Sequence, residues 1–185
     1  MLRYAALVAI ALLALGRPAA AQFEGPPQTD ASIIPADAPN WLPVGAAIDS
    51  ARADTTIVLV HLYATWCGWC ARLDADVYSD DAIQEYMNEH FSATRVDIES
   101  PEVVPFFGRD VPMDQLAEAF GVEGTPTIVF FTAGGHYITK LPGFAPADQF
   151  YLVLRYVNER GYEMMPFPDW AEMNSGAPVR QPTDG

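Results

Sequence analysis

The only two cysteines of the chain lie three positions apart in the stretch LYATWCGWCARL (62–73). Cysteine pairs serve as structural disulfides, as metal ligands or as reversible redox couples. A structural disulfide usually joins distant segments, because closing a long loop restricts the unfolded chain more than closing a short one. A zinc site needs about four ligands, and the chain has three histidines and no second Cys-x-x-Cys pair. The spacing of Cys67 and Cys70 therefore favours thiol–disulfide exchange.

The residues around the pair predict where each thiol lies. Residues 55–64 (TTIVLVHLYA) form a β-branched, almost continuously apolar run, which is typical of a strand buried on both faces. A helix is expected to begin at the cysteines. Cys67 then lies at the helix N-terminus, where free amides and the helix dipole stabilise an anion, and it becomes the nucleophilic thiolate. Cys70, one turn further along, is shielded and can resolve a mixed disulfide.

The remaining elements predict an α/β fold. Strands and helices alternate in the first part of the chain, which favours parallel pairing, and a late hairpin favours an antiparallel pair. The expected architecture is a central mixed sheet of four to five strands with helices on both faces. Besides the elements above, the apolar periodicity predicts helices over 45–54, 80–91, 112–122 and 145–161 and strands over 92–99, 125–132 and 136–143.

Three motifs resemble the thioredoxin superfamily: YATWCGWCARL, GVEGTPTIVFF, and LPGF before the last helix. The resemblance covers about residues 45–161 and implies a thioredoxin fold. Within the superfamily the chain is most similar to exported thioredoxin-related proteins, including those of sulfur-oxidation gene clusters. The segment VYSDDAIQEYMNEHF, with the later VDIE, also resembles the C-terminal thioredoxin-like domain of the transmembrane reductant carrier DsbD.

The resemblance implies roles for individual residues. Cys67 would attack, Cys70 would resolve, and Trp66 would flank the active site. Pro126 would be a cis-proline that faces the disulfide, which leaves the backbone of Thr125 free to pair with a substrate strand. The alternative for Pro126 is an ordinary proline at the start of a strand.

Two positions depart from cytosolic thioredoxins. His61 stands where those proteins carry a buried acid, and Trp69 stands where they carry a proline between the cysteines. Two interpretations of His61 are open: a proton acceptor for Cys70, or a core histidine bonded to a backbone carbonyl. Trp69 adds apolar surface beside the disulfide, which suggests that a protein partner docks there.

Three further residues have alternative interpretations. Arg72 either adds positive potential near Cys67 or forms an ion pair with Asp74 or Asp76. The connection 99–113 is longer than a minimal thioredoxin needs. Its Phe106 and Phe107 either form a partner surface or cover the core, and the core is the more common place for an aromatic side chain.

The ends of the chain predict its compartment. Residues 1–21 combine an early arginine, an apolar run too short to span a bilayer comfortably, and an Ala-x-Ala pattern, as in a cleaved signal peptide. The expected mature protein is soluble, exported to the periplasm or a similar oxidising compartment, and without a stable membrane anchor. Residues 22–43 are expected to be an extended arm, 44–161 a thioredoxin-like domain, and 162–185 a tail whose last ten residues are disordered. Apolar members of this tail (Met165, Phe167 and Trp170) are able to dock on the domain.

The composition excludes some functions. A net charge of −14 over 185 residues repels nucleic acid and anionic membranes. The acidic surface favours a soluble monomer.

The cysteine pair, the resemblance and the expected compartment together predict the function. The expected function is an exported thiol–disulfide oxidoreductase that reduces protein disulfides without cofactor or metal, recharged by a transmembrane thiol carrier. The alternatives are a disulfide oxidase or isomerase, and a module that binds Cu(I), a soft ion that suits thiolates.

Overall fold

The computed structural model describes residues 39–176. The predicted signal peptide, most of the predicted arm and the last nine residues lie outside this range. The four-stranded sheet has the order β2-β1-β5-β6, with β1 (Ile57–Tyr63) at its centre and parallel to β2 (Phe91–Asp97). β5 (Thr127–Phe131) pairs antiparallel with β1 and with β6 (Tyr137–Pro142). The predicted mixed sheet is confirmed.

Side chains alternate between the two faces of the sheet, as the period of a strand requires. On β1, Leu59 belongs to one apolar cluster, and Val58 and Val60 belong to another. β5 behaves in the same way, with Ile128 in the first cluster and Val129 in the second. Both faces are therefore buried, which explains why the strand at 55–64 reads as a nearly continuous apolar run.

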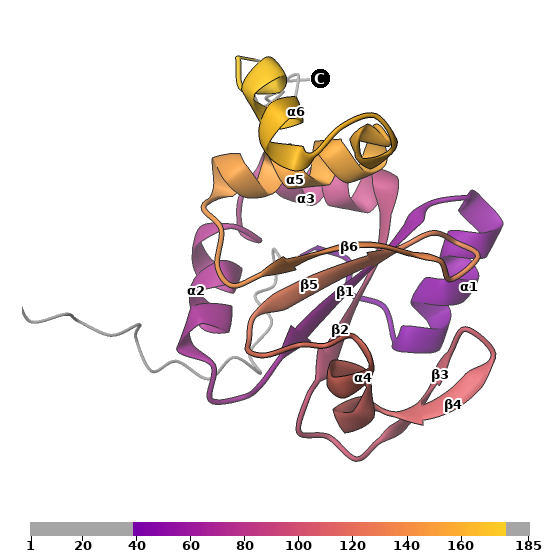
Figure 1. Ribbon diagram of the computed structural model, residues 1–185. Coiled ribbons are helices and arrows are strands. Elements are labelled where there is room, and N and C mark those ends of the chain that lie inside the picture. The colour runs from indigo at the N-terminus through magenta and orange to yellow at the C-terminus, as the bar shows by residue number, and fades with distance from the viewer. Residues whose placement is uncertain (1–38, 177–185) are drawn as a thin grey trace, which may run out of the picture.

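Helices cover both faces, as the sequence predicts (Figure 1). The first cluster packs the sheet against α2 (Gly68–Asp76), α3 (Asp81–His90) and α5 (Ala147–Asn158). The second packs it against α1 (Val44–Asp54) and α4 (Met113–Ala119). Asp80 caps α3 through hydrogen bonds from the amides of Ala82 and Ile83, which is the N-cap that its sequence position indicates.

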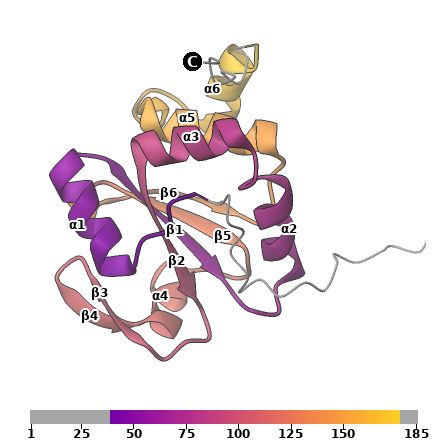
Figure 2. The same cartoon turned by 180° about the vertical axis from the view of Figure 1, so that it is seen from behind.

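The long connection 99–113 is a β-hairpin that the sequence did not predict. It consists of β3 (Val103–Phe106) and β4 (Arg109–Pro112), and in both views it lies beside α1 (Figures 1 and 2). Its two-residue turn is formed by Phe107 and Gly108, both with positive φ. The rings of Phe106 and Phe107 lie 5.5 and 5.6 Å from that of Phe131, so the interpretation of these residues as core is confirmed.

Both ends of the described chain pack on the domain. Leu42 donates its amide to the carbonyl of Ala93 at the edge of the sheet. At the other end a short 3₁₀ turn, η1 (Gly161–Glu163), leads into α6 (Phe167–Asn174), a helix that the sequence did not predict. Trp170 of α6 is buried against Tyr156 of α5, so the expected docking of this tail residue is confirmed. No helix within residues 39–176 is long and apolar enough to cross a bilayer.

Candidate active site

The two cysteines form a disulfide at the N-terminus of α2. β1 ends at Tyr63, and a tight turn follows in which the amide of Cys67 donates to the carbonyl of Ala64. Cys67 is the N-cap of α2, and its Sγ accepts a hydrogen bond of 3.0 Å from the amide of Cys70. The same amide also donates to the carbonyl of Cys67 at 3.0 Å, and it points at the position that a Cys67 thiolate would occupy.

The two sulfurs differ little in burial. Cys67 is 3% exposed and Cys70 is 0% exposed, so Cys67 is less accessible than its place at a helix start suggests, although it is still the more accessible of the two. Both pack with Ala64 and Ala71 in a small apolar cluster. The little exposed area of the pair therefore belongs to Cys67.

The tryptophans that flank the cysteines are exposed. Trp66 is 67% exposed and Trp69 is 38% exposed. Large apolar side chains on a soluble protein surface often mark an interaction site. The ring of Trp69 lies 5.6 Å from that of Phe144, in the loop between β6 and α5, and the guanidinium of Arg72 lies over both rings.

The Gly-Thr-Pro-Thr motif lies at the same end of the sheet as the disulfide. Thr127 pairs with Leu62 in the register of β5 and β1, which places Pro126 level with the end of β1. The Thr125–Pro126 peptide bond is cis, Pro126 is buried, and its carbonyl accepts from the amide of Gly143 at 2.8 Å. Residues of the loop before β5 and residues at the end of β6 line a groove of about 400 Å³ beside Pro126.

His61 lies in β1 and is fully buried. Its ring contacts those of Trp41, Tyr63 and Tyr78 at centroid distances of 5.5–6.0 Å. Burial, and then the charge of Arg95, hold the pKa of His61 well below its ordinary value, so the ring is neutral. Neither ring nitrogen has a hydrogen-bond partner among the described residues, so the backbone carbonyl bond expected for a core histidine is not formed.

A buried ion pair that no sequence pattern predicted lies beside His61. Nη2 of Arg95 lies 3.1 Å from Oδ2 of Asp74, and their side chains are only 7% and 6% exposed. Asp74 follows Cys70 by one helical turn, and the Arg95 guanidinium lies 4.5 Å from the centre of the Tyr63 ring. Burial raises the pKa of Asp74, against the opposing charge and hydrogen bond of Arg95.

Arg72 makes a different ion pair from the one formed by Arg95. Its Nε donates to Oδ2 of Asp76 at 2.8 Å, which decides between the two carboxylates considered from the sequence.

The sequence signal for Asp74 was its position four residues after Cys70, on the buried side of the helix. Its partner Arg95 was not identifiable, because it comes from a strand 21 residues away.

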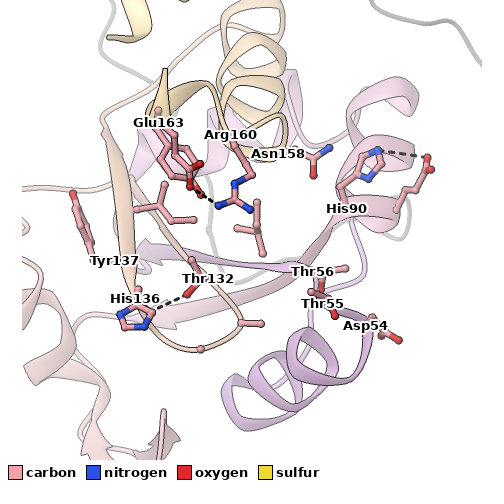
Figure 3. A pocket seen from close by; sticks show the side chains of 16 residues that line it. Asp54, Thr55, Thr56, His90, Thr132, His136, Tyr137, Asn158, Arg160 and Glu163 are labelled. Atoms are coloured by element: carbon pink, nitrogen blue, oxygen red, sulfur yellow. Dashed lines mark hydrogen bonds and ion pairs between the residues drawn. The ribbon is translucent and has the colours of Figure 1, made fainter. Parts of the chain in front are cut away.

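A cavity lined by described residues lies away from the disulfide. It measures about 690 Å³ and is lined by the start of β1 and by the turn between β5 and β6 (Figure 3). Val58 pairs with Phe131 at this end of the sheet, whereas Leu62 pairs with Thr127 at the disulfide end. Figure 3 shows Arg160 of this cavity paired with Glu163. The cavity is therefore separate from the redox site.

The site brings together most of the residues that the sequence singled out. Cys67, Cys70, Trp66 and Trp69 surround the start of α2, and Thr125 and Pro126 lie at the same end of the sheet. Within residues 39–176, no three side chains of His, Cys, Asp or Glu are grouped as ligands for a metal ion. The two thiols of the reduced pair are the soft ligands that the site can offer.

Comparison with known proteins gives a consistent family. The family model of the thioredoxin-like domain matches residues 44–158. The thiol:disulfide interchange protein DsbD of Actinobacillus pleuropneumoniae is 31% identical over 104 residues, covering 55% of this chain and 16% of that protein. The DsbD of Pectobacterium atrosepticum is 30% identical over 129 residues, covering 67% of this chain and 21% of that protein. The chain thus spans about a fifth or less of these relatives.

A solved structure agrees with the sequence relatives. The thioredoxin of Thermus thermophilus superposes with a TM-score of 0.56 and 28% identity, covering 67% of this chain and 90% of that one. The match of the family model, over residues 44–158, includes the sheet, the covering helices and the segment that carries the disulfide. The chain therefore belongs to the thioredoxin-like domain family and carries, at Cys67 and Cys70, the Cys-x-x-Cys disulfide of a thiol–disulfide oxidoreductase.

Proposed function

We propose that the protein is an exported thiol–disulfide oxidoreductase that reduces disulfides in protein partners. The observation that carries this proposal is the disulfide across the first turn of α2, with Cys67 at the N-cap and two exposed tryptophans beside it. A helix N-terminus favours the thiolate that attacks a disulfide, and exposed aromatic rings favour contact with a protein.

The reaction begins from the reduced dithiol. The Cys67 thiolate attacks one sulfur of the partner disulfide, which forms a mixed disulfide and releases the other partner sulfur as a thiolate. Cys70 then loses its proton and attacks the Cys67 sulfur. The Cys67–Cys70 disulfide forms again, and the partner leaves with two thiols. Two electrons pass from the protein to its partner, so no cofactor takes part.

Other residues bind the partner. Trp66 and Trp69 supply apolar contacts, and the backbone of Thr125 beside Pro126 pairs with an extended partner strand.

His61 is the proposed proton acceptor of Cys70. Its lowered pKa makes it a weak base, so this role requires that its proton affinity rises while Cys70 loses its proton. The matched test compares the pH profile of disulfide exchange in the wild type and His61→Gln. An unchanged profile would remove His61 from the mechanism.

The relatives support thiol–disulfide exchange, and the reducing direction is our proposal. Two of them are named thiol:disulfide interchange proteins. We propose that a transmembrane thiol carrier recharges the protein in an oxidising compartment, reached after removal of residues 1–21. The acidic surface disfavours nucleic acid and keeps the protein a monomer.

The test is the reduction potential of the Cys67–Cys70 couple, measured by equilibration with glutathione. A value near about −270 mV, that of thioredoxin, is expected for a reductase. A value near about −120 mV would make the disulfide a strong oxidant and would replace the reductase by a disulfide donor.

Titration of the reduced protein with Cu(I), beside a disulfide-reduction assay, tests the alternative of a Cu(I)-binding module. Tight Cu(I) binding without reduction of any disulfide would favour that alternative.

A further inference from the structure

A platform of three side chains lies beside the disulfide and makes or breaks no bond in the exchange reaction. It is formed by Trp69 and Arg72 of α2 and by Phe144 of the loop before α5. The guanidinium carbon of Arg72 lies 5.6 Å from the centre of the Trp69 ring and 5.4 Å from that of Phe144. We propose that this platform binds a large apolar side chain, preferably an aromatic one, next to the reactive cysteine of a protein partner. The proposal rests on the proposed function and names its substrate class.

The platform is fixed in position relative to the site. Trp69 lies between the two cysteines in the sequence and is therefore attached to the disulfide itself. Phe144 follows Gly143, whose amide donates to the carbonyl of Pro126 at 2.8 Å. A partner strand that pairs at Thr125 is thus held at a constant distance from the rings of the platform. Such pre-organisation lowers the entropy cost of binding.

The aromatic rings of the platform indicate the type of side chain it binds. Trp69 and Phe144 pack at a tilt of 40°, and both leave part of their surface open to solvent. A third ring gains from stacking on such a surface beyond the area that it buries. Arg72 adds a cationic plane on which an aromatic ring also stacks favourably. Small polar side chains gain from neither contact.

The charges around the platform argue against an acidic side chain. Nε of Arg72 donates to Asp76 at 2.8 Å, so the guanidinium already has a carboxylate beside it. The chain as a whole carries a net charge of −14, which repels an acidic segment during approach. The surface therefore offers aromatic rings beside a paired guanidinium rather than an unbalanced positive charge. An uncharged aromatic side chain suits it best.

The platform is one of few exposed apolar surfaces on the described chain. Outside the disulfide region, the large apolar side chains that are exposed within residues 39–176 lie far from the site in sequence and on other elements. They are Val103, Tyr137, Met164 and Met173. Tyr137 begins β6, at the opposite end of the sheet from the disulfide, so it provides a matched control for an exposed aromatic ring.

The experiment compares two short peptides that are closed by a disulfide and carry the same charge. They differ only in having Phe or Ser beside the first cysteine. Pre-reduced protein, freed of its reductant, is mixed with each peptide, and the second-order rate of peptide thiol formation is measured by chromatography. Dithiothreitol alone gives the intrinsic ratio of the two rates. The wild type should exceed that intrinsic Phe-to-Ser ratio by about tenfold.

The variants assign the preference to the platform. Phe144→Ala should bring the ratio close to that of dithiothreitol, and Arg72→Gln should lower it in part. Tyr137→Ala should keep the wild-type ratio. Circular dichroism confirms that each variant is folded, and two independent variants keep the test valid if one of them does not fold.

Two results would overturn the inference in different ways. If the wild type reduces both peptides but shows only the intrinsic ratio, or if both platform variants retain the preference, the platform does not select the partner and the proposed function stands. If the wild type reduces neither peptide, the proposed function itself fails, and this inference fails with it.

Discussion

His61 and Arg95 are neighbours across the β1–β2 ladder, so a buried histidine and a buried ion pair lie next to each other in the sheet. His61 is neutral and packs against the aromatic rings of Trp41 and Tyr78, while Arg95 forms a buried ion pair with Asp74. A buried neutral base and a buried ion pair respond differently to pH and to substitution. The two residues therefore give separable predictions.

The first prediction concerns His61. Its pKa is lowered in the folded state, so the folded protein binds fewer protons than the unfolded chain below the unfolded value of about 6.5. Its contribution to stability is therefore present above pH 6.5 and is lost as the pH falls. We expect the free energy of unfolding to fall by up to about 1.4 kcal/mol per pH unit from this residue alone.

Urea unfolding at several pH values between 7 and 5 measures this slope. His61→Leu should flatten it, because no buried group is then left to take up the proton on unfolding. His136→Gln, which removes a histidine at the surface, should keep the wild-type slope. A His61→Leu variant with the wild-type slope would show that His61 is not the group responsible.

The second prediction concerns Arg95. Arg95→Leu leaves the Asp74 carboxylate buried without its partner, which costs about 3–5 kcal/mol when one member of a buried pair is removed. The control is Arg52→Leu at the exposed pair with Asp49, where a change within about 0.5 kcal/mol is expected. Chemical denaturation at pH 7 measures both. Equal losses in the two variants would mean that burial of the Arg95 pair has no energetic consequence.

At the scale of elements, the sequence predicted the sheet and its covering helices, because β1 and β5 are nearly continuous apolar runs and the apolar residues of α5 follow helical spacing. It predicted Cys67, Cys70, Trp66 and Trp69 as neighbours because they share one short segment. It missed the β3–β4 hairpin, since both strands have only four residues and Phe107 adopts a positive φ that its side chain does not favour.

The sequence missed α6 and the Asp74–Arg95 pair for related reasons. α6 is a short helix in a segment rich in proline and polar residues, and only its packing on Tyr156 and its neighbours stabilises it. The ion pair joins a helix to a strand that are distant in the sequence. No local pattern encodes a contact that forms only when the sheet and the helix have docked.

A glycine in the β5–β6 turn gives a prediction for the packing of the β3–β4 hairpin. Gly135 has a φ of 87°, and a Cβ at this position would lie 2.7 Å from the Phe107 ring. Gly135→Ala therefore combines backbone strain with a steric clash and should destabilise the fold by about 1–3 kcal/mol. Gly134→Ala, whose nearest contacts would be 3.8 Å away, is the matched control and should be milder. Thermal unfolding compares the two, and equal effects would contradict the close packing of Phe107 under this turn.

Packing of α6 gives a second prediction at this scale. Trp170 is buried against Tyr156 and lies beneath the guanidinium of Arg155. Trp170→Ala removes this contact and should lower the free energy of unfolding by about 3–5 kcal/mol. Met173→Ala in the same helix changes an exposed side chain and should have an effect within about 0.5 kcal/mol. If both variants unfold at the same urea concentration, α6 contributes nothing to the domain.

At the scale of the whole molecule, folding and the redox state are linked. The fold holds Cys67 and Cys70 at the start of a helix whose residues also pack on the sheet. If the folded state stabilises the disulfide relative to the dithiol, the disulfide stabilises the folded state by the same free energy. The stability of the two redox forms therefore reports the direction in which the couple transfers electrons.

A reductase has a disulfide that its fold favours, so the oxidised protein should resist urea more than the reduced protein. A shift of 30 mV in the potential corresponds to about 1.4 kcal/mol in this two-electron couple. Unfolding curves measured with and without dithiothreitol give the difference, and a Cys67→Ser/Cys70→Ser variant shows how far dithiothreitol acts on anything other than the disulfide. A reduced form more stable than the oxidised form would mark the disulfide as an oxidant. Electrons would then flow from partner thiols into Cys67 and Cys70, and the transmembrane carrier would have to remove them rather than supply them.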